Sequence, residues 1–518
     1  IHNPQRVWFA WLKDEEEGKV IARRSPNDQN PYIAMKVRRD TIFYHSGEII
    51  YIPKNEKIKL YCIKKHMIYT TTKDTFWVQW QFDTIQWKFN GATVNNNSIV
   101  IDANNLNSNQ SYQLAVSIPV QSKDFQIGDK IYTPKSDTIA YNLEYSVIIV
   151  DNPIIEFIRG KNYHGEYGFD NDFWSCNTCY DTAKINNVDY KIPWLSLQKN
   201  KEEKIHALIR IPPDQYKALK KLGHEFKFYG TNLKINGTDT FKVNINTLKE
   251  GENLIDLSVK ALQITPGIFA TPEKMYGTSG NIVTGMLNYF SLDYESFHKQ
   301  RLDIVPVFFN PANTSINIDI NKIETYFNEQ SYNQAFVSWR TKEHAPILIN
   351  WNNDSLILKD MISLAINQNW YTQPDRNYLR IINDIKTGIF NQYSAGVIQH
   401  FLTVYFSKKN ISLYDSIYKT KGKYLMFITD LSQNGGEDGI GMVNGHICTI
   451  FKNGIGSYDV YVHEIGHNLG LSHVFENKGQ PGELGTTQGR SENFMDYFNS
   501  KLIFWKTQWE FIYNQTKP

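Results

Sequence analysis

Hydrophobic and polar residues alternate along much of the first half of the chain. The segment GEIIYIPKNEKIKLYCIKK (47–65) alternates and is interrupted by a turn at 53–55. The segment YNLEYSVIIV (141–150) alternates, becomes continuously apolar, and ends at the Asp-Asn-Pro of 151–153. Short strands at this spacing, without a helical period, are typical of antiparallel β-sandwiches. Residues 1–265 are therefore predicted to be all-β.

A loose internal repeat suggests how this β-rich part is divided. WKFNGATVNNNSIVIDANNLNSNQSYQLAVSI (87–118) aligns with FKFYGTNLKINGTDTFKVNINTLKEGENLIDLSV (226–259). Two interpretations stay open, since strands and turns of unrelated β domains also align this well by accident. We predict immunoglobulin-like sandwich structure over 1–152, which has strands enough for two units, and a second such domain over 153–265.

The pattern changes in the second half of the chain. Residues 266–300 are punctuated by Gly, Pro, Ser and Thr, which predicts a connector. From residue 301 onward, apolar runs of strand length alternate with segments of helical spacing. This order predicts an α/β domain over 301–518, with a sheet backed by helices. The predicted strands are 301–310, 335–340, 345–352, 423–431 and 440–451, and the predicted helices are 319–330, 374–393 and 457–470.

The stretch YVHEIGHNLGLSHVFE (461–476) contains three histidines at a spacing that suits a metal ion. His463 and His467 are four positions apart, so they lie on one helical face and their imidazoles can reach a single ion. Gly470 can adopt the left-handed conformation that ends a helix, and this turn would bring His473 back toward the other two. Three neutral nitrogens and a water form the open tetrahedral site of a hydrolytic zinc ion, so we predict one catalytic Zn²⁺ here.

Glu464 stands next to a predicted ligand but points to a different angle on the helix. A general base for the zinc-bound water is needed at that place. One alternative is a surface helix with chance histidines, but five fixed positions match by chance in about one chain of this length in tens of thousands. A zinc site without catalysis is a second alternative, and it is disfavoured because purely structural sites are usually closed by four protein ligands.

A second motif follows the histidines. SENFMDYFNS (491–500) places Met495 about twenty residues after His473. The pattern His463-Glu464-x-x-His467-x-x-Gly-x-x-His473 with this methionine resembles the metzincin metallopeptidases, whose long zinc motif is followed by a tight Met-turn beneath the metal. NFMDY, the HVFE that ends the first motif, and an aromatic-rich helix with KTQ (506–508) are most similar to the bacterial pappalysin-like branch.

This resemblance implies a zinc-dependent endopeptidase that hydrolyses peptide bonds in protein or peptide substrates, with Glu464 as general base. Met495 would pack under the histidines, and Tyr497 would help to hold the transition-state oxyanion, as a tyrosine here does in several subfamilies. Substrate backbone contacts are expected along 440–451, since an unpaired sheet edge offers a ladder of N–H and C=O groups. Residues 498–502 would line part of the primed-side pocket.

The resemblance covers 301–518, and its specific part is 445–500. Val474 follows the third histidine, where reprolysins have Asp and astacins have Glu. The segment between His473 and Met495 is short and lacks the cysteines common in pappalysins, and no cysteine-switch propeptide is evident. The subfamily and the mechanism of latency therefore stay open.

Three weaker signals have simpler structural explanations. Cys176 and Cys179 form a lone CxxC, which favours a local disulfide or two free thiols in a loop. The segment DLSQNGGEDG (430–439) offers oxygen ligands for Ca²⁺ but lacks EF-hand spacing, so a solvated turn is favoured. His446 is expected to be a packed or rim histidine and not a catalytic one.

Composition limits the partners more than it defines them. The chain has 518 residues, 41 % hydrophobic and 14 % aromatic, enough to build several domains with large cores. Its 55 basic and 53 acidic residues are well mixed, which argues against nucleic acid or an anionic membrane as the main partner. No apolar stretch of about eighteen residues predicts a transmembrane helix. The oligomeric state is left open.

Two functional hypotheses follow. The first is a secreted or cell-surface exported zinc endopeptidase whose β domains target it or present its substrate. The second is a targeted binding protein or toxin effector, delivered by an injection apparatus, whose protease domain acts on one narrow target. The abundance of Asn, Lys, Ile and Tyr is a sign of an AT-rich bacterial genome. The chain begins at Ile1 without a signal-peptide pattern, and a missing leader in the full-length gene would favour the second hypothesis.

Overall fold

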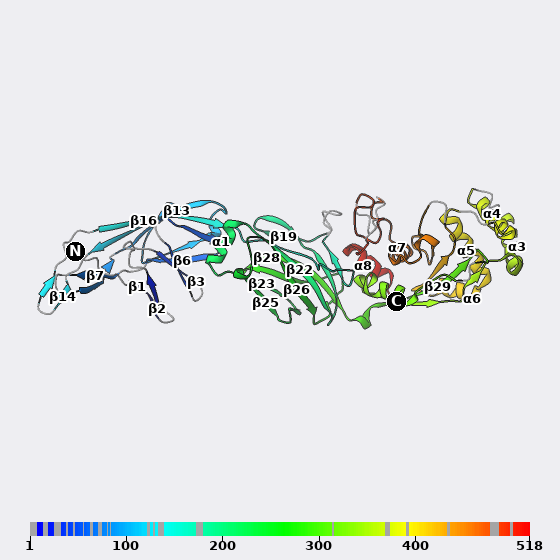
Figure 1. The fold of residues 1–518 in the computed structure, drawn as a ribbon, viewed down its shortest axis with the longest axis horizontal. Coiled ribbons are helices and arrows are strands. Elements are labelled where there is room, and N and C mark those ends of the chain that lie inside the picture. Colours follow the sequence, from blue (N-terminus) through cyan, green and yellow to red (C-terminus); the bar gives the residue numbers. More distant parts are fainter. Residues whose placement is uncertain are drawn as a thin grey trace.

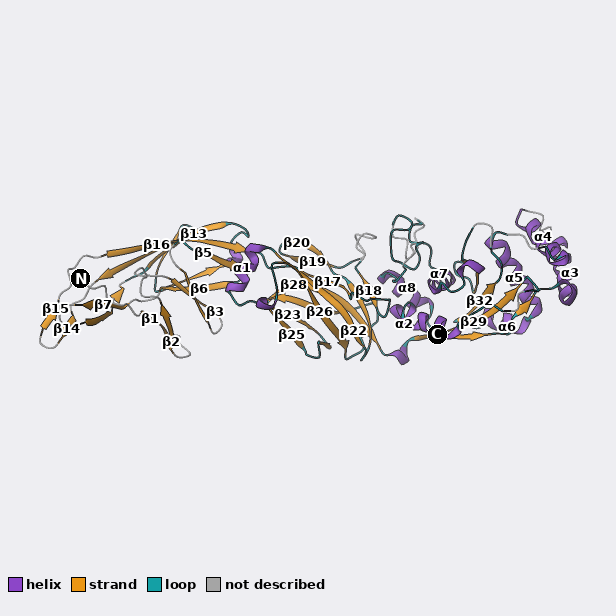
Figure 2. Cartoon of the chain, in the orientation of Figure 1, coloured by secondary structure: helices purple, strands orange, loops and turns teal. Residues whose placement is uncertain are grey.

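The computed structural model shows three regions that follow one another along one long axis (Figure 1). Two are built from β-sheets, and the third combines a sheet with helices (Figure 2). This confirms the predicted order of β structure followed by α/β structure. The structure describes the chain apart from residues 1–7, 14–18, 25–32, 38–39, 45–46, 55, 63–65, 71–74, 80, 83, 122–124, 128–129, 133–138, 172–179, 313–314, 368–372, 390–392, 433–435, 477–485 and 498–500.

The first region is a sandwich of two sheets around one core, called here the first sandwich. One sheet has the order β11-β10-β13-β16-β5 and the other β12-β6-β3-β4. Alternate residues point inward, so that Trp87 of one sheet and Leu60 and Ile101 of the other share the core. Its elements are β3 (Ile33–Val37), β4 (Asp40–Tyr44), β5 (Ile49–Pro53), β6 (Lys57–Cys62), β10 (Gln86–Phe89), β11 (Ala92–Asn95), β12 (Ser98–Asp102), η1 (Ala103–Asn105), β13 (Ser111–Gln121) and β16 (Ile139–Val150).

Shorter strand pairs accompany the first sandwich. They are antiparallel, and one of them adds to the end of β13. These elements are β1 (Trp8–Lys13) with β2 (Lys19–Arg24), β7 (His66–Thr70) with β8 (Thr75–Gln79), β14 (Phe125–Ile127) with β15 (Lys130–Tyr132), and β9 (Gln81–Phe82), which pairs with β13.

The second region, called here the second sandwich, also has two sheets. Their orders are β17-β22-β26-β24 and β18-β21-β28-β27-β23-β25. Its elements are β17 (Ile155–Arg159), β18 (Gly168–Asp170), β19 (Thr182–Ile185), β20 (Val188–Lys191), β21 (Trp194–Gln198), β22 (Glu202–Ile211), α1 (Pro213–Lys221), β23 (Glu225–Gly230), β24 (Leu233–Ile235), β25 (Thr240–Asn244), η2 (Ile245–Thr247), β26 (Gly251–Ala261), β27 (Glu273–Ser279) and β28 (Ile282–Leu292).

The expected connector over 266–300 is wrong, because β27 and β28 are central strands of the second sandwich. The glycines that suggested a connector allow the two sheets to approach each other. A Cβ at Gly277 would lie 2.9 Å from Ile155 Cδ1, and one at Gly285 would lie 2.4 Å from the Ile155 carbonyl oxygen. Glycine inside a strand here marks close packing and not a loop.

The aligned segments 87–118 and 226–259 contain similar elements in the same order. In both, a short η helix is capped by an Asx side chain, Asp102 or Asn244, and a long strand follows. Their sheet positions differ, however. β13 pairs directly with β10, whereas β26 lies in the sheet opposite β23. The strands matched by this alignment are not equivalent, which favours the accidental interpretation.

The third region, called here the α/β region, has the sheet order β30-β29-β32-β34-β33. Neighbouring strands are parallel except for β33, which is antiparallel to β34 at the edge. Its elements are η3 (Tyr294–Ser296), β29 (His298–Phe308), α2 (Ile320–Glu329), η4 (Tyr332–Ala335), β30 (Val337–Glu343), β31 (Ile347–Leu348), α3 (Trp351–Asn367), α4 (Gln373–Thr387), α5 (Ala395–Lys409), α6 (Ile411–Lys419), β32 (Lys423–Thr429), β33 (Gly439–Gly441), β34 (Ile447–Ile450), η5 (Lys452–Gly454), α7 (Tyr458–Asn468) and α8 (Lys506–Gln515).

The two faces of this sheet belong to different cores. Leu302 and Ile304 of β29 pack with α2, α7 and α8, while Val305 and Val307 pack with α3 to α6. The core that contains α7 continues into the second sandwich. None of the described helices is long and apolar enough to cross a membrane.

Several predicted elements of this region need correction. The strand predicted over 440–451 is a hairpin of β33 and β34, because Asn444 adopts a positive φ of 59° and the Gly445 N–H closes a turn on Met442. The strand predicted over 345–352 is only the two-residue β31, and α3 begins at Trp351. The helix α4 ends at Thr387 and not near 393, with Gly388 at a positive φ directly after it.

Candidate metal centre

Helix α7 carries the first two predicted ligands and ends as the sequence predicts. Gly470 has φ +98°, its N–H bonds the His467 carbonyl at 2.8 Å, and the Leu471 N–H bonds the Gly466 carbonyl at 3.0 Å. This pair of bonds is the Schellman motif, which uses a left-handed residue to reverse the chain. The reversal brings His473 back over the end of the helix.

The three histidines converge. The Nε2 atom of His473 lies 3.2 Å from Nε2 of His463 and 3.2 Å from Nε2 of His467. One ligand atom from each ring lies within 4.8 Å of the others, and in the described part of the chain these residues are the only such group of His, Cys, Asp or Glu. His463 and His467 are buried, and His473 is partly exposed.

Each ring uses its other nitrogen to bond the protein. His463 Nδ1 lies 2.6 Å from the Phe494 carbonyl oxygen, and His467 Nδ1 lies 2.7 Å from the Leu471 carbonyl oxygen. His473 Nδ1 lies 3.0 Å from a carboxylate oxygen of Glu476. Because these oxygens accept, each Nδ1 must carry the proton and donate it. Each ring then directs its Nε2 toward the centre, the orientation that partners of metal-binding histidines impose.

This arrangement fits a divalent cation. Burial lowers the pKa of His463 well below its ordinary value, and burial, with His473 as a smaller cause, lowers the pKa of His467 to about 4. At neutral pH these rings are therefore uncharged. Lone pairs of neutral rings that face one another repel, since no hydrogen atom lies between them, and a cation among them would remove that repulsion. Three nitrogen donors with one open side suit zinc.

Glu464 lies on the same helix, 6 % exposed, and packs against the edge strand β33. Burial raises the pKa of its carboxyl to about 8, while Lys501 and a backbone hydrogen bond with Gly441 act in the opposite direction. A nearby cation would favour the charged carboxylate. The side chain therefore has the environment of a group that can take up and release a proton near neutral pH.

Met495 lies beneath the helix, in a tight turn that its neighbours fix. Its side chain is fully buried, and a Cβ at Gly466 would lie 2.5 Å from its sulfur. The turn is closed by the Met495 N–H, which donates to Asn493 Oδ1 at 2.8 Å. The buried carboxylate of Asp496 accepts hydrogen bonds from the backbone N–H groups of Gly489, Arg490, Ser491 and Tyr497 and from the Ser491 hydroxyl.

Tyr497 lies on the open side of the centre. Its side chain is 51 % exposed, and its hydroxyl oxygen is 2.9 Å from His473 Nε2. Burial, with Glu464 as a smaller cause, raises the pKa of this phenol to about 12, so the hydroxyl keeps its proton at neutral pH. A protonated phenol at this position can donate a hydrogen bond to an oxygen that develops negative charge.

The edge strand β33 lies directly against the helix that carries Glu464. A Cβ at Gly439 would lie 2.8 Å from Glu464 Cγ, and one at Gly441 would lie 2.3 Å from the Glu464 carbonyl oxygen. Only glycine allows this approach. Among the described strands, β33 pairs only with β34, and on its outer edge the Gly441 N–H bonds the Glu464 carboxyl. An unpaired strand edge of this kind is where an extended chain can be added.

The remaining sequence predictions have varied outcomes. Cys176 and Cys179 lie outside the described residues, as do 498–500 of the expected primed-side pocket. His446 packs against the rings of Tyr418 and Tyr424. The carboxylate of Asp430 accepts the backbone N–H groups of 309 and 310, and residues 433–435 of the segment that offered oxygen ligands lie outside the described residues.

Sequence reasoning missed four residues that shape the centre. Gly439 and Gly441 admit the edge strand, and Asn493 and Asp496 fix the methionine turn. The two glycines carried a usable signal, because isolated glycines in a strand indicate close backbone approach. Asn493 and Asp496 carried none, because Asx residues that bind nearby backbone resemble those of any turn.

Comparison with known proteins supports a metallopeptidase. The family model described as Metallo-peptidase family M12B Reprolysin-like matches residues 433–502. That range contains the three histidines, Glu464 and the methionine turn. The match supports a zinc-dependent peptidase in general. It is to a reprolysin-like model even though Val474 stands where reprolysins have Asp.

Other comparisons add little. A search of curated proteins finds no match. A solved structure described as "Structure of a chaperone-substrate complex" is similar over 51 % of this chain and 38 % of that chain, at 10 % identity and a TM-score of 0.25. The polymeric Ig receptor ectodomain of a teleost fish is similar over 48 % of this chain and 98 % of that chain, at 7 % identity and a TM-score of 0.14. The chain thus spans well under half the length of the first of these, and scores this low carry no argument about the sandwiches.

Proposed function

We propose that this protein is a zinc-dependent endopeptidase of metzincin type, with His463, His467 and His473 as the ligands of one zinc ion. One observation carries the proposal: three Nε2 atoms converge while every Nδ1 is engaged by the protein. The buried Glu464 beside them, the methionine turn below them and the outer edge of β33 are the further parts that peptide hydrolysis requires.

His463, His467 and His473 would hold the zinc ion, which would supply the Lewis acidity needed to activate water and polarise the scissile carbonyl. Glu464 takes a proton from the attacking water and delivers it to the amine that leaves. The Tyr497 hydroxyl, which keeps its proton at neutral pH, donates a hydrogen bond to the oxygen on which negative charge develops.

The substrate is held as an extended strand along the outer edge of β33, where backbone hydrogen bonds give affinity that depends little on side chains. Exposed apolar groups stand at the turn beside this edge, since Met442 is 65 % exposed and Val443 is 43 % exposed. Within the metzincins the NFMDY and HVFE motifs are most similar to the bacterial pappalysin-like branch, and we propose secretion from a bacterium as the setting. Cleavage-site profiling with a peptide library would define the substrate.

The test is to replace Glu464 by Gln and to measure both zinc content and the cleavage of a denatured protein mixture. Glu464→Gln is expected to keep zinc bound and to lower turnover by at least about 100-fold, since the general base is lost. The matched control is Glu295→Gln, because the side chain of Glu295 is 88 % exposed and belongs to η3. Unchanged turnover in Glu464→Gln, or loss of its zinc, would contradict the assigned role.

A further inference from the structure

The second sandwich is bound so closely to the α/β region that the two form one unit. We propose that this sandwich is a built-in support of the proposed catalytic site, and that Gln334 and Asp170 are positioning residues that hold the described parts of the segment 492–508, residues 492–497 and 501–508, in place. The proposal rests on the proposed function, because that segment carries the methionine turn and Tyr497. It adds a structural role to the targeting or substrate presentation that the sequence led us to expect of the β domains.

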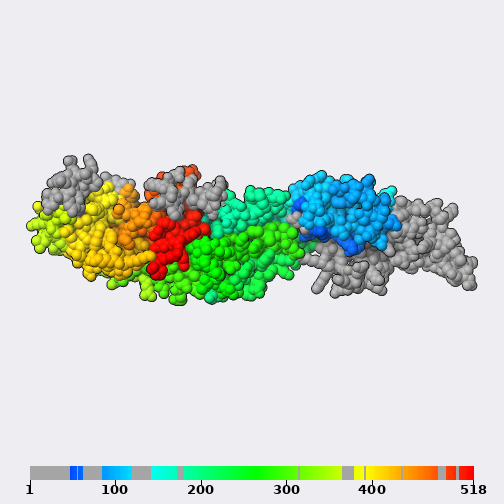
Figure 3. Space-filling view, turned by 180° about the vertical axis from the view of Figure 1, so that it is seen from behind, coloured from blue at the N-terminus to red at the C-terminus, as the bar shows by residue number. Residues whose placement is uncertain are grey.

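The first support for this proposal is a shared core. Phe169 and Trp194 of the second sandwich, Tyr332 and Trp509 of the α/β region, and Met495 belong to one continuous buried cluster. In Figure 3 the C-terminal residues lie between the second sandwich and the rest of the α/β region. By contrast, the core of the first sandwich includes only Leu222 from the described residues beyond that sandwich.

The second support is close backbone approach at two glycines of the second sandwich. A Cβ at Gly165 would lie 2.1 Å from the Gln330 carbonyl oxygen, at the end of α2. A Cβ at Gly168 would lie 2.6 Å from the ring of Trp509 on α8. Interfaces between independent domains are usually more polar and looser than this. The fit is that of a domain interior.

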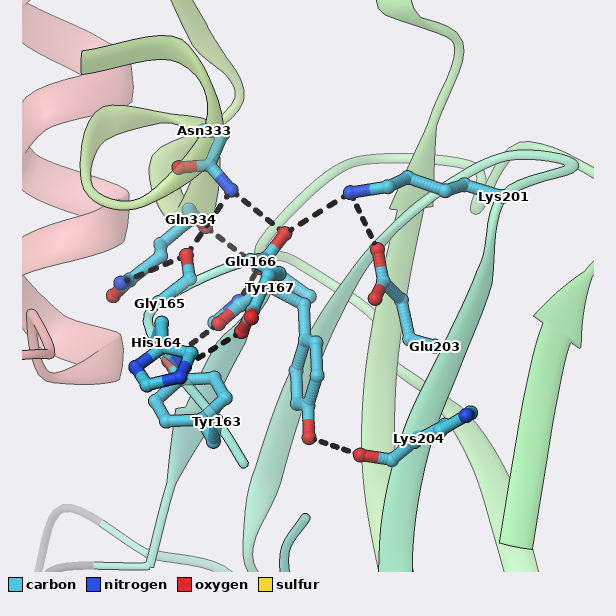
Figure 4. Close-up of polar contacts among 12 residues, drawn as sticks. Tyr163, His164, Gly165, Glu166, Tyr167, Lys201, Glu203, Lys204, Asn333 and Gln334 are labelled. Carbon is cyan, nitrogen blue, oxygen red and sulfur yellow. Dashed lines mark hydrogen bonds and ion pairs between the residues drawn. The ribbon is translucent and has the colours of Figure 1, made fainter. Parts of the chain in front are cut away.

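Gln334 links the sandwich to the wall of the site. Its Ser196 partner lies in β21, where the Ser196 hydroxyl donates to the Gln334 carbonyl oxygen at 2.7 Å. The side-chain amide of Gln334 is fully buried and bonds two backbone groups near the site. Its Nε2 donates to the Leu502 carbonyl at 2.8 Å, and its Oε1 accepts from the Phe504 N–H at 2.9 Å. Figure 4 shows Asn333 and Gln334 reaching the carbonyls of Gly165 and Glu166.

The same backbone continues to the metal ligands. The Phe494 N–H donates to the Ile503 carbonyl at 2.8 Å. Residues 502–504, which Gln334 bonds, therefore also support the methionine turn. The Phe494 carbonyl in turn accepts from His463 Nδ1 at 2.6 Å. If the Gln334 side chain no longer fixed residues 502–504, the Phe494 backbone that bonds Ile503 would lose a support. The His463 ring, which donates to the Phe494 carbonyl, could then change its orientation. The direct partners of metal ligands, such as the Phe494 carbonyl here, usually affect metal affinity or activity roughly 10- to 100-fold.

Asp170 of β18 supports the other end of the segment. Its buried carboxylate accepts the Lys506 N–H at 2.7 Å, the first free donor of α8. An acidic group at a helix N-terminus stabilises that helix, and here it comes from another region of the chain. The Lys506 ammonium lies 4.9 Å from the centre of the Trp194 ring, and Arg159 pairs with Glu492 at 2.6 Å. Contacts from three strands therefore converge on 492–508.

The experiment compares full-length variants that differ only at this interface. Gln334→Met keeps the length of the side chain and removes its polar atoms, and Asp170→Ala removes the helix cap. Gln263→Met and Asp189→Ala are matched controls, since both residues are exposed and belong to the second sandwich. Zinc affinity by chelator competition, hydrogen exchange over 492–508, and kcat and KM are measured for each.

Gln334→Met and Asp170→Ala are expected to bind zinc about 10-fold or more weakly, or to lose kcat by that factor, with faster exchange over 492–508. KM should change little, and Asp170→Asn, which keeps an acceptor oxygen, should recover most of the loss. Controls should behave as wild type. If Gln334→Met does not fold, Ser196→Ala takes its place, and faster exchange at 502–504 is expected.

Folded variants with wild-type zinc affinity, kcat and exchange would overturn the support role. The two proposals fail differently. A wild-type protein that binds zinc but cleaves no substrate contradicts the proposed function, while zinc affinity and exchange still decide the support role. A wild-type protein that cleaves normally, with unaffected interface variants, contradicts the support role alone.

Discussion

At the scale of single residues, the centre depends on which backbone positions are free to bend. Gly470 has a left-handed conformation and also lies where a Cβ would be 2.5 Å from Asn444 Oδ1. A side chain at this position would strain the left-handed backbone, and its Cβ would also collide with Asn444. The glycine is therefore expected to be required for the position of His473 and not only for the end of α7.

Gly470→Ala should destabilise the fold by roughly 1–2 kcal/mol and weaken zinc binding by at least about 10-fold. Gly456→Ala is the control, because Gly456 has a similar φ of +92° but nothing lies within 4 Å of its Cβ position. The control should lose comparable stability and keep its zinc affinity. Denaturant unfolding and chelator competition give the two numbers, and equal zinc affinities in both variants would argue against this account.

The sequence predicts the residues that meet at the centre but not what orients them. The histidine spacing and Gly470 are local signals, and the structure brings the rings together as that spacing suggests. The carbonyls of Phe494 and Leu471, which orient two of the rings, have no side-chain signature. They could not be identified from residue types, because any residue offers a carbonyl.

At the scale of elements, β33 links the substrate edge to the catalytic helix. It is only three residues long and exposes one edge, and its two glycines touch Glu464. A side chain at Gly441 would push the strand away from α7 or displace the Glu464 backbone. Either movement would separate the bound peptide from the proposed base.

Gly441→Val is expected to lower kcat/KM by at least about 100-fold while zinc content stays close to one equivalent, since a misplacement of about 1 Å can cost that factor. Ala92→Val is the control, because Ala92 is an exposed residue of β11 in the first sandwich and has no contact with β33. Steady-state kinetics on a peptide identified by profiling would measure the difference. Equal kinetics for both variants would exclude a positioning role for β33.

The helices α2 and α5 show which helical pattern the sequence reveals and which it does not. Helix α2 has Ile323 and Phe327 on one buried side and was predicted within one residue of its limits. Helix α5 buries residues around much of its circumference, so no helical stripe appears in its sequence. The strands β27 and β28 were not predicted, because their glycines resemble those of a loop. In the structure these glycines allow close contact with Ile155 of β17.

At the scale of the whole molecule, regions that share a hydrophobic core should unfold together. The second sandwich and one face of the α/β sheet belong to one buried cluster, the other face of that sheet packs with α3 to α6, and the first sandwich has its own core. We expect two unfolding units, one for 47–150 and one for 155–518. A chelator should lower the stability of the second unit only, because zinc binds its folded form alone.

Hydrogen exchange at increasing denaturant, with and without chelator, measures this directly. Peptides from 155–292 and from 298–518 should share one unfolding free energy and respond together to zinc removal. Peptides from 47–150 are the internal control and should not respond. An α/β region that stays protected after 155–292 has lost its protection would contradict a single unit.

The central claim is that three histidines hold one metal ion in an otherwise ordinary fold. Elemental analysis of the purified full-length chain, beside His467→Ala, tests it most directly, because His467 supplies one of the three nitrogens. The account predicts one equivalent of zinc in the wild-type protein and a loss of most of it in the variant. Wild-type protein without bound metal, or equal metal content in both proteins, would contradict it.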